Sequence, residues 1–228
     1  MPGGFSNKPK ILRGAFVEYG LSIPPLFVVF QFNPDQLTRN RSLSFSAATP
    51  GETGSSLRQF HKDTEDLLTI QEKQLVTVEE ESISFDIRLD ATDKLNEGDA
   101  ITEQFGIAPR LATLELMIHP KDESLLGAAV SSLLGSSDGF SFTKGENPPM
   151  ILFIWGLKRV LPVNITSIDI TETEFSTTLD PIRATVSVNL TVIEGKNLVY
   201  LYTKAVKEVS SALNLANIGD IADIVIPG

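Results

Sequence analysis

Residues 182–192 alternate strictly between apolar and polar side chains, and this pattern constrains the fold more than any other part of the chain. The apolar positions are Ile182, Ala184, Val186, Val188, Leu190 and Val192, and the polar ones between them are Arg183, Thr185, Ser187, Asn189 and Thr191. Successive side chains of a β-strand point to opposite faces, so the pattern predicts a long strand with one buried face. Residues 81–89 alternate in the same way, with Ile83, Phe85, Ile87 and Leu89 on one face. Two such strands predict an antiparallel sheet whose second face meets water or another subunit.

The other apolar segments predict further strands and a few helices. Strands are expected within 11–32, over 150–155 and over 160–175, with a break at Pro24 and Pro25 and a kink at Pro162. Helices are expected over 107–118, 122–134 and 198–213, the last of them amphipathic. The sequence therefore predicts a mainly β fold with one or two helices and an additional C-terminal helix.

Composition along the chain predicts three regions. Residues 1–10 are rich in Gly, Ser, Asn and Pro and are expected to form a flexible N-terminal arm. Residues 11–195 are expected to form one β domain that carries a long loop over 44–62, where Ser, Thr, Gly and Pro are dense. Residues 196–228 are expected to form a helix and a short apolar tail.

Charge and cysteine content exclude several classes of function. The chain of 228 residues has no cysteine, which excludes a disulfide scaffold, a thiolate zinc site and a cysteine nucleophile. Its formal net charge is −10, which argues against nucleic acid or an anionic membrane as the main partner. We find no signal-peptide pattern and no apolar run long enough to span a bilayer. We therefore expect assembly in the cytoplasm without membrane insertion, and export by a route without a signal stays open.

No recognisable catalytic, cofactor or metal motif occurs in the sequence. GxSxG, P-loop and GxGxxG patterns are absent, and His61 and His119 lie far apart. Asp86, Asp90 and Asp93 lack the glycine and the close ligand spacing of a calcium loop. The acidic run 79–81 is interpreted as a solvated face, with a tube lumen or a basic partner ring as alternatives. We predict a protein that is not an enzyme and needs no cofactor or metal.

Several short motifs, taken in order, resemble the tube proteins of contractile injection systems, which are phage-tail-like machines. The resemblance covers roughly residues 10–195. The motif residues are Phe32, Asn33 and Pro34; Asp90, at the end of the strand 83–93; the helix 106–115; Pro148 and Pro149, followed by Trp155 and Gly156; Phe175; and Pro181 with Arg183. The PP-x-x-x-F-x-WG element is the most specific of these.

The resemblance implies a fold and an assembly. Family tube domains consist of two packed antiparallel sheets, sandwich-like or barrel-like, and they assemble as six-fold rings. Under this reading the motif residues serve the fold or the assembly. Trp155 is then a core residue, Gly156 permits a tight turn, and Asn33 and Pro34 shape a turn or, alternatively, contact another subunit.

The resemblance also implies a structural role. We expect a tube-initiating or baseplate adaptor whose ring binds the spike protein, the inner-tube protein and other baseplate proteins within a phage-tail-like particle. The alternatives are a repeating inner-tube subunit, or a module that binds cargo or cell-wall glycan. Family members often carry a C-terminal LysM domain that binds peptidoglycan. The residues after Leu213 are too few for such a domain, which counts against a glycan-binding role.

Overall fold

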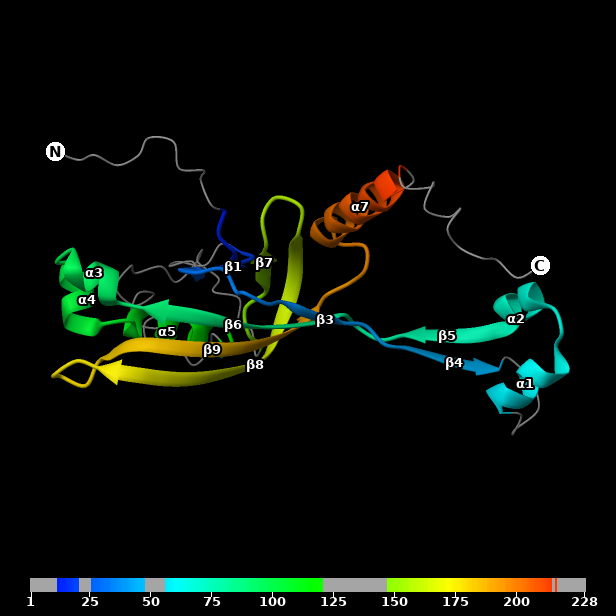
Figure 1. Ribbon diagram of the computed structural model, residues 1–228, viewed down its shortest axis with the longest axis horizontal. Coiled ribbons are helices and arrows are strands. Elements are labelled where there is room, and N and C mark those ends of the chain that lie inside the picture. Colours follow the sequence, from blue (N-terminus) through cyan, green and yellow to red (C-terminus); the bar gives the residue numbers. More distant parts are fainter. Residues whose placement is uncertain (1–11, 21–25, 48–55, 121–146, 215, 217–228) are drawn as a thin grey trace, which may run out of the picture.

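The computed structural model describes residues 12–20, 26–47, 56–120, 147–214 and 216. Its main element is a seven-stranded antiparallel sheet with the strand order β2-β1-β7-β8-β9-β6-β3 (Figure 1). The strands are β1 (Ala15–Glu18), β2 (Phe27–Val29), β3 (Thr38–Asn40), β6 (Ser82–Asp90), β7 (Ile151–Ile154), β8 (Val160–Phe175) and β9 (Pro181–Val192). The predicted mainly β antiparallel fold is confirmed, and the two strands with the clearest alternation, β6 and β9, lie side by side.

The sheet curls over itself without closing into a barrel. Phe16 of β1 lies on Phe85 of β6 with ring centroids 6.0 Å apart, although these strands are four steps apart in the sheet order. Phe30 and Phe153 complete the cluster, and the Phe85 and Phe153 ring centroids are 5.3 Å apart. No hydrogen-bonded ladder joins the edge strands β2 and β3. The barrel-like expectation therefore holds for the shape, whereas the hydrogen-bonded sheet stays open.

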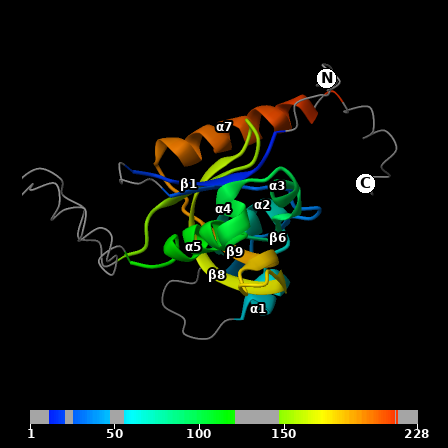
Figure 2. The same ribbon diagram turned by 90° about the vertical axis from the view of Figure 1, so that its left-hand side faces the viewer.

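Three short helices follow β6 and cover one end of the core. They are α3 (Thr92–Asn96), α4 (Ala100–Phe105) and α5 (Ala108–Leu116). Leu111, Leu114 and Met117 bury their side chains against the sheet, as the helical spacing over 107–118 predicted. In the end-on view of Figure 2, β1 and the C-terminal helix α7 (Leu198–Leu213) lie above these helices and β8 and β9 lie below. The helix expected over 122–134 lies outside the described residues.

A β-hairpin projects from the body in place of most of the predicted long loop. It consists of β4 (Leu43–Ala47) and β5 (Gln74–Val78), with α1 (Leu57–Asp63) and α2 (Leu67–Lys73) near its far end (Figure 1). The expectation of a loop over 44–62 is therefore wrong for the parts that β4 and α1 occupy. Local capping accounts for the helices, because Ser56 accepts a hydrogen bond from the N–H of Gln59 and Asp66 accepts from that of Thr69. The described chain has six helices, more than the few predicted.

Candidate functional site

The outer faces of β6, β9 and β8 form a polar panel, by which we mean the side of these three strands that points away from the aromatic core. Hydrogen bonds join its side chains across the strands. Ser187 Oγ donates to Asp86 Oδ1 at 2.7 Å, and Asn189 Nδ2 donates to Ser167 Oγ at 2.8 Å. The panel positions are Ser82, Ser84, Asp86 and Arg88 of β6, Arg183, Thr185, Ser187, Asn189 and Thr191 of β9, and Asn164, Ser167, Asp169, Thr171 and Thr173 of β8. The panel therefore presents polar side chains, most of them small, without an apolar interruption.

Both flanks of the polar panel leave long strand edges unpaired. On one flank, β3 pairs only with Ser82–Ser84, and no described strand pairs with the rest of β6 on that side, where the N–H of Asp90 donates to Gln31 Oε1 at 3.0 Å. On the other flank, β7 pairs only with the first four residues of β8, up to Val163, and no described strand pairs with residues 164–175 on that side. Such edges carry free N–H and C=O groups and are templates for strand addition.

An open groove of about 660 Å³ runs along the unpaired edge of β6. The segment from Phe32 to Gln36 forms one wall, and Arg88 lies on the other. An exposed ion pair spans the groove, with Asp35 Oδ2 3.5 Å from Arg88 Nη2. Phe32 itself is half-exposed at the rim, and Pro34 lines the wall next to it. The groove therefore gives a neighbouring chain access to the β6 edge.

Asn33 joins the β2 side of the sheet to the segment before β1. Its Oδ1 accepts from the backbone N–H of Gly14 at 2.9 Å, and its Nδ2 donates to the carbonyl of Leu12 at 2.8 Å. The side-chain amide thus continues the β1–β2 ladder by mimicking a backbone peptide group. Gly14 must be glycine here, because a Cβ would lie 2.6 Å from Cδ2 of Phe30 and 2.9 Å from Cε3 of Trp155.

Trp155 lies at the margin of the core, where its ring stacks on Phe153 with centroids 5.9 Å apart. Gly156 follows with φ of 66° in the turn between β7 and β8, a conformation that favours glycine. Pro148 and Pro149 lie just before β7, the first exposed and the second half-buried.

A polar cluster with Asp90 and Arg183 at its centre lies at one end of the panel. The two residues face each other across β6 and β9, and Arg183 Nε donates to Asp90 Oδ2 at 2.8 Å. Arg183 also donates to Glu174 at 2.6 Å, and the N–H of Thr92 donates to Asp90 at 2.7 Å. Burial alone would raise the pKa of Asp90, but the hydrogen bonds from Thr92 and Arg183 hold it below its ordinary value.

The two remaining motif residues lie close to this cluster. Phe175 and Pro181 face each other where the β8–β9 turn begins and ends. The carbonyl of Pro181 accepts from the N–H of Ile107 at 2.9 Å and so ties the turn to the start of α5. The fold therefore brings Asp90, Phe175, Pro181 and Arg183 to one end of the panel, away from the turn that holds Trp155 and Gly156.

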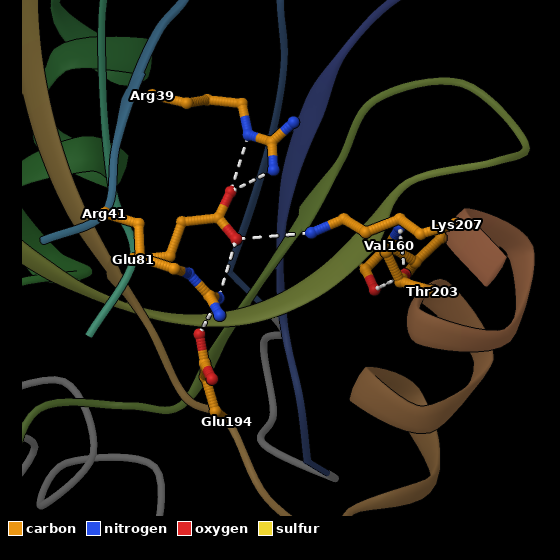
Figure 3. Close-up of polar contacts among 7 residues, drawn as sticks. All are labelled: Arg39, Arg41, Glu81, Val160, Glu194, Thr203 and Lys207. Carbon is orange, nitrogen blue, oxygen red and sulfur yellow. Dashed lines mark hydrogen bonds and ion pairs between the residues drawn. The ribbon is translucent and has the colours of Figure 1, made fainter. Parts of the chain in front are cut away.

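A second polar cluster, the Glu81 cluster, lies at the other end of the panel (Figure 3). Glu81 is 2% exposed, and its carboxylate accepts from Arg39 Nε at 2.5 Å, Arg41 Nη2 at 3.2 Å and Lys207 Nζ at 3.2 Å. Arg41 also pairs with Glu194 after β9. The cluster therefore joins the root of the hairpin, the start of β6, the end of β9 and α7.

The charge of Glu81 is stabilised by these cations. Burial by itself would raise the pKa of Glu81, but the hydrogen bond and charge of Arg39, together with those of Lys207, hold it below its ordinary value. Burial lowers the pKa of nearby Arg159, and the positive charge of Arg39 acts in the same direction. Glu81 therefore remains ionised and compensates a locally positive region.

Sequence reasoning missed the Glu81 cluster. It interpreted residues 79–81 as a solvated acidic face. One signal was available: Glu81 has the same strand parity as Ile83 and Phe85, which lie on the buried face. An acid at a buried position needs a cation, and the sequence does not show which cations fold back onto it.

The polar panel, its two open edges and the buried anchors at its ends are features of a protein that assembles with other chains. Comparison with known families supports this interpretation, because the profile for "contractile injection system tube protein" matches residues 20–198. The chain belongs to the contractile injection system tube protein family. No curated protein matches its sequence significantly.

Family membership gives this tube protein a structural role in the tube of a contractile injection system, and structural tube proteins are not a class of enzyme. The match contains every residue that the sequence analysis assigned to the family motifs. Within the described part of the chain, no helix is long and apolar enough to cross a membrane.

Proposed function

We propose that this tube protein forms a six-fold ring that joins the spike to the inner tube as a tube-initiating adaptor. The observation that carries the proposal is the pair of unpaired edges on opposite flanks of the polar panel, on β6 and on β8. One edge can pair with the other edge of the next copy. Such a head-to-tail contact is heterologous, and it closes into a ring when the rotation between copies divides a full turn.

The polar panel suits the inner wall of such a ring. Most of its side chains are short, and some satisfy each other by hydrogen bonds, such as Ser187 to Asp86 and Asn189 to Ser167. Edge-to-edge pairing would join the panels of successive copies into one continuous sheet. That sheet would turn its polar face to a hydrated lumen and its apolar face to the aromatic core of each copy.

The hairpin and α7 favour an adaptor over a repeating subunit. Both lie outside the panel and add contact surface to it (Figure 1). An adaptor must bind unlike partners, namely the spike, other baseplate proteins and the first ring of the inner tube. We infer that the ring assembles in the cytoplasm as part of a phage-tail-like particle.

The stoichiometry of the chain in purified sheathed particles tests the adaptor role. Quantitative mass spectrometry would compare its copy number with that of the main tube protein. We expect a ratio equal to one ring per particle. A ratio equal to many rings would make this chain the repeating tube subunit, and its absence from particles would overturn the proposal.

Two proline variants test the edge pairing. Successive N–H groups of a strand point to opposite sides, so one of Thr171 and Glu172 points its N–H toward β9 and the other toward the open edge of β8. We expect Thr171→Pro and Glu172→Pro to behave differently. The variant that loses the N–H toward β9 should melt at a lower temperature. The variant that loses the N–H toward the open edge should keep its melting temperature but lose ring formation in size-exclusion chromatography with light scattering. If both variants form normal rings, the β8 edge is not the contact.

A further inference from the structure

The C-terminal helix α7 docks onto the body through Thr203 and Lys207, with Tyr200 packed against the core beside them. Thr203, 1% exposed, donates its Oγ1 proton to the carbonyl of Val160 at 2.6 Å and accepts from the N–H of the same residue at 3.1 Å. Lys207, one turn further along, reaches Glu81 (Figure 3). Hydrogen bonds, an ion pair and the packing of Tyr200 therefore hold the inner side of the helix.

The apolar side of α7 points away from the body. Leu198, Leu201, Val209 and Leu213 follow helical spacing and are 84%, 42%, 62% and 70% exposed. At 3.6 residues per turn, Leu198, Leu201 and Val209 lie on the side opposite Thr203 and Lys207, and Leu213 lies at the margin of that stripe. An amphipathic helix normally buries its apolar face, so the exposed apolar stripe of α7 is left for another chain.

The hairpin carries a second uncovered apolar face. Leu43 faces Val78 and Phe45 faces Val76 across β4 and β5, so these four side chains share one side of the hairpin. Each of them is between 45% and 52% exposed. The other side of the hairpin is mainly polar, with Ser44 opposite Thr77 and Ser46 opposite the exposed Leu75. The hairpin is thus an amphipathic two-stranded ribbon without a covering layer among the described residues.

Strand register places these two apolar faces at the same end of the polar panel. Ser82 of β6, Thr191 of β9 and Asn164 of β8 lie at one level of the sheet. The hairpin joins the chain just before Ser82, and α7 contacts β8 at Val160, just before Asn164. Pairing of the β6 edge of one copy with the β8 edge of the next would therefore bring the hairpin of the first beside α7 of the second.

Charge favours the same contact. Glu79 and Glu80 are exposed at the root of the hairpin, where β5 ends. Lys204 is exposed on α7 beside its apolar stripe, where its Nζ lies 4.0 Å from Oε1 of the exposed Glu208. Opposite charges next to two matching apolar faces help to set the register of an interface.

We propose that the hairpin of one copy covers the apolar stripe of α7 on the adjacent copy in the ring. This inference rests on the proposed ring, whose geometry supplies the juxtaposition. Within one chain, the Glu81 cluster fastens the hairpin root to α7 through Arg39, Arg41 and Lys207. Hairpin and helix would then alternate around the ring as a continuous hoop.

Engineered disulfides test the contact directly, because the chain has no cysteine. Single-cysteine variants Phe45→Cys and Val209→Cys would be mixed in equal amounts, oxidised and run on a non-reducing gel. We expect a cross-linked dimer, and a ladder of higher species when one chain carries both substitutions. Ser44→Cys mixed with Val209→Cys is the matched control, because Ser44 lies on the polar face of the same strand. It should give no product.

The outcomes separate this inference from the ring itself. Rings without the 45–209 disulfide would overturn the hairpin–helix contact and leave the edge pairing intact. Equal cross-linking by Ser44→Cys would also overturn it, because the contact would not be selective for the apolar face. In purified particles, cross-linking of Val209→Cys to a different protein would show that another component covers α7. Absence of both rings and cross-links would overturn both proposals.

Discussion

Glu81 Oε2 lies 3.2 Å from Nζ of Lys207, and 126 residues separate the two in the sequence. The carboxylate is buried at the root of the hairpin, whereas the ammonium group comes from the C-terminal helix. One buried acid thus contacts both the root of the hairpin and α7, and neither the hairpin strands nor α7 belong to the ladders of the main sheet.

The substitution Glu81→Gln should destabilise the protein by about 2–3 kcal/mol. It keeps the shape of the side chain but leaves Arg39, Arg41 and Lys207 without their shared counter-charge. Because all three cations are partly exposed, the loss should fall below that for a fully buried pair. Urea denaturation would measure it, with Glu79→Gln as an exposed control that should change little. Equal stability of the two variants would contradict the anchoring role of Glu81.

Protonation of the Glu81 carboxylate should lower the stability of the fold at acidic pH. The pKa of Glu81 is held below its ordinary value of 4.5, so the folded state binds a proton less readily than the unfolded state. This stabilisation is fully present above pH 4.5. It is lost as the pH falls through the pKa that Glu81 has in the folded state, which is lower than 4.5. Unfolding free energies from pH 7 to pH 3 should therefore drop more steeply for the wild type than for Glu81→Gln. Parallel pH profiles would show that other groups dominate.

Replacing Trp155 by Ala should cost about 2–4 kcal/mol, in the range of large-to-small changes at partly buried core positions. The ring stacks on Phe153 and covers the close approach of Gly14 to Phe30. Leu157→Ala, in the same turn at an exposed position, is the matched control. Thermal melting compares the two, and unchanged melting of the Trp155 variant would show that this residue is not part of the core.

The two hydrogen bonds of Asn33 can be separated by paired substitutions. Asn33→Ala loses both partners and should cost about 1–2 kcal/mol, whereas Asn33→Asp keeps the acceptor for the N–H of Gly14 and loses the donor to Leu12. We expect the aspartate variant to be the more stable of the two. Equal effects on the unfolding midpoint would indicate that Asn33 does not continue the β1–β2 ladder.

Much of the fold could be predicted from local pattern. Alternation over 182–192 and 81–89 located β9 and β6 because a half-buried strand repeats every two residues. Helical spacing located α5 and α7 in the same way. The hairpin was missed because Ser and Thr are common both in loops and on a solvated strand, and its apolar residues 43, 45, 76 and 78 come from two distant segments. The family motifs named Asp90 and Arg183 without showing that they face each other.

By itself, the sequence determined which faces of the long strands are apolar, that α7 is amphipathic and that the chain carries the tube-family motifs. Those properties depend on residues within about one element of each other. Only the tertiary structure decided that Glu81 is buried among Arg39, Arg41 and Lys207, that the polar panel has two open edges, and that α7 leaves its apolar stripe exposed. Each of these features depends on which distant segments contact each other. Local periodicity does not distinguish between the possible contact partners, and only long-range packing determines which of them meet.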